Sequence, residues 1–169
     1  MDIQEGVLTF SFATSDGSLA SQYDTWAFYR KQFINVANGT KAVDFIYLDN
    51  NQKTAWLIEV KDYRHPDTEQ IKPSKLGEVV ALKVRDTLAG LVAASCNAND
   101  PQEKKLAKQA LKTKSFRVVL HMEQHQHRLK FIDPADVLLK LKQKLKAVDA
   151  HPCVVHQGNL KSAMRWTVS

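Results

Sequence analysis

The sequence has few cysteines and no long apolar run. Only two of its 169 residues are cysteines, Cys96 and Cys153, too few for the disulfide framework of a small secreted domain. No stretch approaches the ~20 apolar residues that a membrane-spanning helix needs. The first five residues carry acids where a secretory signal carries bases, and no apolar segment follows them. These absences predict a soluble, cytoplasmic protein with reduced thiols.

The composition is that of an ordinary folded domain. Hydrophobic residues make up 44% of the chain and charged residues 25%, which argues against disorder and against a fibrous or repeat protein. A chain of 169 residues can bury one proper core and is short for two domains. We therefore expect residues 1–169 to form a single domain.

Charge is unevenly distributed along the chain. Lysine and arginine number 24 and the acids 18, a net charge of +6. Residues 1–60 hold four basic and seven acidic residues, whereas residues 61–169 hold 20 basic and 11 acidic ones. This excess favours a polyanionic partner such as nucleic acid. A solvated lysine-rich surface that only keeps the protein soluble remains the alternative.

Hydrophobic periodicity predicts a mixture of helices and strands. The expected fold class is therefore α/β, a mixed central sheet flanked by helices. Strands are predicted at 6–13, 42–48, 54–61, 116–123 and 128–132, and a closing hairpin at 153–156 and 160–168. Helices are predicted at 19–36, 76–95, 101–112 and 134–148. The third of these begins with a capping acid, a proline and a glutamate three residues after the cap.

The central hairpin carries charges inside two apolar strands. If its turn is centred between residues 51 and 52, Asp44 lies opposite Glu59, and directly opposed Cβ atoms are ~4.5–5.5 Å apart. Strand alternation puts Glu59 and Lys61 on one face. Two acids this close need a positive partner, and a divalent cation with oxygen ligands is one that suits them. A surface ion pair of Glu59 with Lys61 is the structural alternative.

Asp44 followed by Glu59-Val60-Lys61 resembles the signature of the PD-(D/E)xK nuclease superfamily, although Val43 stands where the name has proline. The resemblance covers about residues 19–123 and leaves 124–169 as additions. It implies a restriction-endonuclease-like core and a metal-dependent nuclease that hydrolyses phosphodiester bonds, most readily in DNA. It further implies Mg²⁺ or Mn²⁺ at Asp44 and Glu59, a catalytic Lys61, and Asp24 as a further acid. Cutting both strands of a duplex would require a homodimer.

Two other classes of protein stay open. One is a non-catalytic nucleic-acid-binding or adaptor protein that retains the nuclease-like fold. The other is an unrelated basic α+β protein whose charges decorate its surface.

Basic residues after the hairpin are candidate nucleic-acid contacts. Arg64, His65, Lys72 and Lys75 follow Lys61 within one loop region, where a substrate strand could pass. The lysines of helices 101–112 and 134–148 either bind phosphates or form a solvated basic face. His121, Glu123, His125 and His127 share one parity and suggest zinc ligation, but we favour polar turn residues for this segment.

Overall fold

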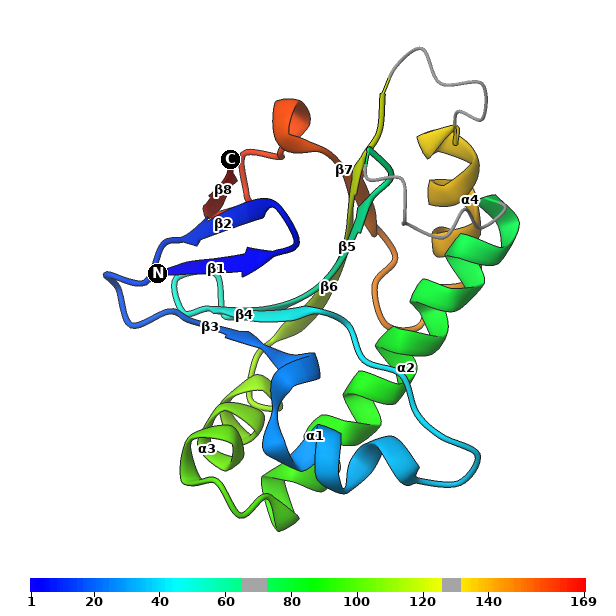
Figure 1. Cartoon of the computed structure of the whole chain (residues 1–169). Coiled ribbons are helices and arrows are strands. Elements are labelled where there is room, and N and C mark those ends of the chain that lie inside the picture. Colours follow the sequence, from blue (N-terminus) through cyan, green and yellow to red (C-terminus); the bar gives the residue numbers. More distant parts are fainter. Residues whose placement is uncertain (65–72, 126–131) are drawn as a thin grey trace.

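The computed structural model describes residues 1–64, 73–125 and 132–169. It has three layers, with helices on one face of a five-stranded sheet and a smaller three-stranded sheet on the other (Figure 1). None of the helices described is long and apolar enough to cross a membrane.

The central sheet has the strand order β3-β4-β5-β6-β7. These strands are β3 (Leu19–Gln22), β4 (Phe45–Asp49), β5 (Thr54–Asp62), β6 (Ser115–Glu123) and β7 (Cys153–Val155). The β3–β4 and β4–β5 pairs are antiparallel, and the β5–β6 and β6–β7 pairs are parallel. Parallel neighbours need crossover connections, which α2 and α3 provide before β6 and α4 provides before β7.

Four helices contribute apolar side chains to the larger core, on one face of this sheet. They are α1 (Ala27–Lys31), α2 (Pro73–Asn97), α3 (Pro101–Ala110) and α4 (Pro134–Leu145). The 25-residue α2 packs against both α3 and α4 (Figure 1). Its buried residues Leu76, Val80 and Val84 recur at helical spacing. Leu57 from β5 and Leu120 from β6 meet this helix layer.

The second sheet covers the opposite face with β1 (Asp2–Glu5), β2 (Leu8–Phe12) and β8 (Trp166–Val168). Both of its strand pairs are antiparallel. Its buried Phe10 packs against Phe45 of β4, with ring centroids 5.0 Å apart, and Trp166 packs against Trp56 of β5 at 5.3 Å. The terminal segments thus form one small sheet that closes the second core.

The predicted hairpin and its register are confirmed. Phe45 pairs with Ile58 and Asp49 with Thr54, so Asp44, one residue before β4, lies at the position facing Glu59. The predicted alternation also holds, because Trp56, Ile58 and Val60 belong to the core against the small sheet, whereas Leu57 belongs to the core against the helices.

The predicted helix at 19–36 is wrong. Residues 19–22 form β3 and pair with β4, and the remainder divides into a 3-10 turn at Tyr23–Thr25, the short α1 and a second 3-10 turn at Phe33–Asn35. Aromatic residues gave this segment a helix-like spacing. In the structure, however, the rings of Trp26 and Tyr29 both pack on Tyr23 in a local cluster instead of along a continuous helix face.

The predicted closing hairpin is also wrong, since β7 pairs with β6 of the central sheet and β8 with β2 of the small sheet. The predicted strand at 128–132 lies almost wholly outside the described residues. The mixed sheet flanked by helices is confirmed as the fold class. The restriction-endonuclease-like core remains a prediction, and α1 here lies between β3 and β4.

Candidate functional site

The hairpin brings Asp44, Glu59 and Lys61 together as predicted. Glu59 is fully buried on β5, and its Oε1 lies 3.2 Å from Lys61 Nζ. Asp44 is 8% exposed and accepts a hydrogen bond of 2.6 Å from the Val60 amide through Oδ2. The Asp44 carboxylate is therefore held against β5 by a backbone group beside Glu59.

Lys83 of α2 completes this cluster and is the site residue that sequence reasoning missed. Its Nζ lies 2.6 Å from Glu59 Oε1 and 3.8 Å from Asp44 Oδ1. The only local signal was a lysine among the apolar residues of this helix, between the exposed Leu82 and the buried Val84. Its ammonium supplies the positive charge that two neighbouring acids require.

The electrostatics of the cluster follow from burial. Burial, followed by the nearby Asp44 charge, raises the pKa of Glu59 to about 7, against the opposing effect of Lys83 and Lys61. Burial works against the charge on Lys83, but Glu59 and Asp44 outweigh it and raise the pKa of Lys83. Glu59 therefore titrates near neutral pH while Lys83 stays protonated.

Asp24 and Glu5 extend the negative charge toward the surface. Burial and then Asp44 raise the pKa of Asp24, and burial, Asp44 and Asp24 raise the pKa of Glu5. Asp24 Oδ1 is buried without a hydrogen-bond partner among the described residues. Glu5 accepts a hydrogen bond of 2.9 Å from Gln22 Nε2. The predicted further acid, Asp24, thus lies in the electrostatic neighbourhood of Asp44.

A surface cavity of about 290 Å³ borders the cluster. Asp24, Asp44 and Lys83 line it, together with Tyr29, Arg30 and Lys41, but Glu59 does not. A carboxyl that titrates near neutrality is suited to proton exchange. Glu59, however, lies beneath Lys83 and Lys61 and does not face solvent in this conformation.

The predicted metal ligands are already bridged by an ammonium. Lys83 contacts both Asp44 and Glu59, so a divalent cation between them would have to displace it. Within residues 1–64, 73–125 and 132–169, no three His, Cys, Asp or Glu side chains are grouped closely enough to hold a metal ion. This arrangement does not fit a divalent cation, and the predicted Mg²⁺ or Mn²⁺ stays a prediction.

The candidate nucleic-acid contacts after Lys61 have different environments. Arg64 makes two hydrogen bonds to Asp62, of 2.9 and 2.7 Å, and lies 3.8 Å from Glu123. Lys75 is exposed in the first turn of α2. His65 and Lys72 lie outside the described residues. Because Arg64 is engaged with acids of its own chain, it is a poor primary contact for phosphate.

His121 and Glu123 lie against the small sheet. His121 Nε2 is 3.0 Å from Glu123 Oε1, and both residues are buried. The His121 ring packs edge-on against Phe10, and burial lowers the pKa of His121. His125 is exposed, and His127 lies outside the described residues. The contacts of His121 and Glu123 account for them as a buried polar pair within the second core.

A second candidate site lies along α3. Lys105 and Lys108 of the helix and Lys112 and Lys114 after it are exposed, as is Lys53 from the β4–β5 turn. The backbone brings Lys53 to this surface, because the Lys114 amide donates to the Lys53 carbonyl at 2.8 Å. We name these five lysines the α3 lysine face. None of them forms an ion pair with a residue that the structure describes.

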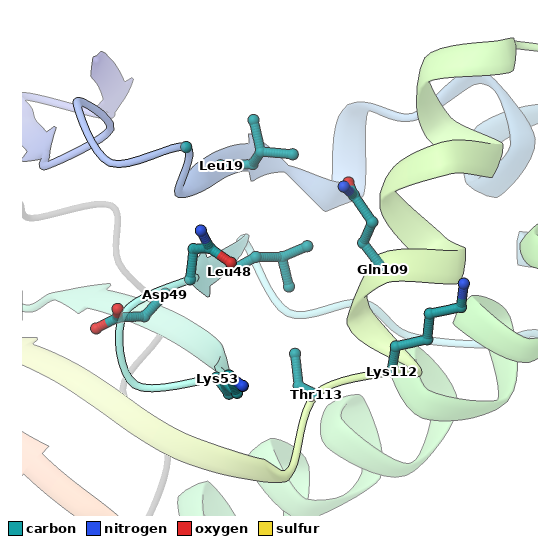
Figure 2. A pocket seen from close by; sticks show the side chains of 9 residues that line it. Leu19, Leu48, Asp49, Lys53, Gln109, Lys112 and Thr113 are labelled. Carbon is teal, nitrogen blue, oxygen red and sulfur yellow. The ribbon is translucent and has the colours of Figure 1, made fainter.

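A groove runs between β3 and α3 beside this face. Two cavities of about 250 and 570 Å³ share Leu19 and Gln109 as lining residues. In the smaller cavity, Leu19 and Leu48 come from strands and Gln109 reaches across from α3 (Figure 2). Lys53 and Lys112 stand at its margin. We name the two cavities together the β3–α3 groove.

Comparison with known proteins gives one informative similarity. The chain is 32% identical, over 173 aligned positions, to a protein named cysteine--tRNA ligase from Neisseria meningitidis serogroup A / serotype 4A (strain DSM 15465 / Z2491). The alignment covers 85% of this chain and 24% of the relative. The chain thus spans about a quarter of the length of the curated relative it matches. No family model matches the chain, and no solved structure matches it.

This similarity overturns the prediction of a metal-dependent endonuclease. The relative bears the name of a tRNA ligase, not of a phosphodiester hydrolase. The sequence reasoning failed because it took the residue pattern of Asp44, Glu59 and Lys61 as evidence of a reaction. The spatial cluster is real, but a residue pattern on a fold does not by itself determine the chemistry.

Proposed function

We propose that this chain is a nucleic-acid-binding domain whose partner is RNA, and specifically tRNA. The relative is named for an enzyme that acts on tRNA, and this chain resembles about a quarter of it. The chain would serve tRNA ligation by binding the RNA. Its net charge of +6 suits a polyanionic partner.

The observation that carries this proposal is the uncompensated charge of the α3 lysine face. The acids at the start of α3 bind backbone amides and do not pair with these lysines. The Asp100 carboxylate accepts hydrogen bonds from the Gln102 and Glu103 amides of its own helix. The Glu103 carboxylate accepts from the Ala27 and Phe28 amides of α1. The lysines beyond them have no acidic partner among the described residues, as expected of groups that bind phosphates.

The buried cluster around Glu59 supports the assignment of phosphate binding to the α3 lysine face by contrast. Its positive groups Lys61 and Lys83 are directed at acids of the same chain, and Arg64 is directed at Asp62. These cations are less free to bind an external anion than the α3 lysine face. Helix α4 provides the matched comparison, because Lys142 of the helix and Lys146, which follows it, are also exposed, and Lys144 lies 3.8 Å from Glu78.

Two triple variants of equal charge change test the proposal. One is Lys105→Glu/Lys108→Glu/Lys112→Glu, and its matched control is Lys142→Glu/Lys144→Glu/Lys146→Glu at the far end of the helix layer (Figure 1). Binding of unmodified tRNA is measured by filter retention at about 0.15 M salt. We expect the α3 variant to lose about 100-fold in affinity and the α4 variant less than tenfold, because phosphate contacts dominate nucleic-acid affinity.

A DNA duplex of the same charge serves as the specificity control. We expect tRNA to bind at least tenfold more tightly than this duplex. Absence of tRNA binding by the wild-type chain would contradict the proposal. Equal losses of tRNA affinity in the two triple variants would instead show that net charge alone drives binding and that α3 has no specific role.

A further inference from the structure

The β3–α3 groove combines an apolar floor with a polar and cationic margin. Leu19 is 36% exposed at the surface, and Leu48 lies beneath it at 6%. Gln109 projects from α3 toward Leu19, and Lys53 and Lys112 line the same cavity (Figure 2). The groove continues past Gln109 toward Lys105 and the buried Trp26.

This combination matches the parts of an unpaired nucleotide. A base needs an apolar surface for its ring faces and an amide or other polar group for its edge, whereas its phosphate needs a nearby cation. Leu19 and Leu48 offer the apolar surface and Gln109 offers the amide. Lys53 and Lys112 offer the cations. In an A-form duplex the ring faces are stacked inside the helix, so only single-stranded RNA presents all of these groups together.

We infer that the β3–α3 groove binds unpaired nucleotides of the RNA, with one base seated over Leu19 and Leu48 and its edge bound by Gln109. This inference rests on the RNA-binding function proposed above and assigns that function a single-stranded segment. The rest of the α3 lysine face binds the phosphates that lead to and from this base.

An extended peptide is the competing occupant, because β3 is an edge strand of the central sheet and exposed edges can pair with an added strand. The charges favour RNA. Lys53, Lys105 and Lys112 all line the groove, and strand addition does not require cations at these positions. The acids in the same lining are engaged within the chain: Asp100 and Glu103 accept backbone hydrogen bonds, and Asp49 accepts from the Gln52 amide and lies 3.3 Å from Arg165.

The test compares a ten-nucleotide single-stranded RNA with an RNA hairpin of equal charge, both labelled for fluorescence anisotropy. The groove variant is Leu19→Ser/Gln109→Ala. Its control is Leu139→Ser/Gln143→Ala, which removes the same groups from exposed positions on α4. Thermal denaturation of each variant establishes that it is folded. We expect the single strand to bind about tenfold more tightly than the hairpin, and the groove variant alone to lose this preference.

The outcomes separate this inference from the proposed function. Equal affinity for single strand and hairpin, or a preference that survives in the groove variant, would overturn the inference and leave tRNA binding by the lysines standing. Wild-type protein that retains neither tRNA nor the single strand would overturn both. Hydrogen exchange at the β3 amides tests the competing occupant. If a strand-forming peptide slows this exchange and RNA does not, the groove binds a protein strand and the inference is overturned.

Discussion

At the scale of single residues, Lys83 links the acids of the hairpin to the helix layer. Its ammonium is the closest cation to Glu59 and also reaches Asp44. The register that placed Asp44 opposite Glu59 could be predicted, because a short turn fixes which hairpin residues face each other. The approach of Lys83 could not be predicted. Lys83 lies 24 residues after Glu59, and its position depends on how α2 packs on the sheet.

We expect Lys83→Met to lower the free energy of unfolding by about 3 kcal/mol at pH 8. Removing one partner of a buried ion pair leaves the other charge uncompensated, and Glu59 has no exposure to solvent. Urea denaturation measures the loss. The control is Lys144→Met, which removes a largely exposed ion pair with Glu78 and should cost less than about 1 kcal/mol. Similar losses in both variants would show that Lys83 does not neutralise the cluster.

The titration of Glu59 gives a second prediction at this scale. Its pKa is about 7 in the folded protein and 4.5 in the reference state, so the folded protein binds the proton more tightly. The stabilisation from this proton is complete below pH 4.5 and is lost as the pH rises through 7. Relative to Glu59→Gln, which does not titrate, the wild type should lose up to about 3 kcal/mol across this range.

Stability measured at intervals from pH 4.5 to 8 for wild type and Glu59→Gln tests this expectation. The difference between the two proteins is the informative quantity, because other groups titrate alike in both. A difference that stays constant with pH would show that the pKa of Glu59 is unshifted by folding. A difference that grows in favour of the wild type as the pH rises would show that folding lowers the pKa of Glu59 instead of raising it.

At the scale of elements, Glu103 joins α3 to α1. The sequence predicted a helix start with Asp100 as the capping acid and Glu103 three residues after it, and Asp100 caps the helix as expected. The Glu103 carboxylate instead accepts from the Ala27 amide at 2.6 Å and the Phe28 amide at 3.0 Å. It therefore supplies the N-terminal cap that the five-residue α1 lacks from its own Trp26.

We expect Glu103→Ala to cost about 1–2 kcal/mol, because two amides at a helix start lose a charged acceptor. Thermal unfolding measures the effect, and slowed hydrogen exchange at Ala27 and Phe28 in the wild type should disappear in the variant. Glu78→Ala on α2 is the control, since Glu78 is half exposed and lies only 3.8 Å from Lys144. A variant as stable as the wild type would mean that water replaces the cap without cost.

The strands and helices that sequence predicted best are those with long periodic patterns. Strands β5 and β6, nine residues each, and the long α2 were all predicted within a few residues. Strand β3 has four residues, too few for a period to identify it. Strands β7 and β8, of three residues each, fall within the strands predicted at 153–156 and 160–168, but their pairing was predicted wrongly. Their partners are also distant in sequence, as with Phe10 opposite Val168, so local pattern could not reveal that β7 and β8 belong to different sheets.

At the scale of the whole molecule, the distribution of charge separates two regions. The hairpin cluster pairs its cations with its own acids, whereas the α3 lysine face leaves its cations open to solvent. The sequence showed the basic excess but not which lysines were free, because pairing depends on tertiary contacts. Salt dependence of binding can measure this freedom, since each phosphate neutralised by a free lysine releases condensed counterions.

We expect the affinity for tRNA to fall linearly with salt concentration on logarithmic axes. Neutralising Lys105, Lys108 and Lys112 together by substitution with glutamine should reduce the slope by about three, one for each lost phosphate contact. The same change at Lys142, Lys144 and Lys146 removes equal charge from the molecule and should reduce the slope by less than about one. If net charge alone governed binding, both variants would change the slope equally. A larger change in the α3 variant would therefore locate the phosphate contacts on α3, because the slope counts contacts and is insensitive to uniform weakening.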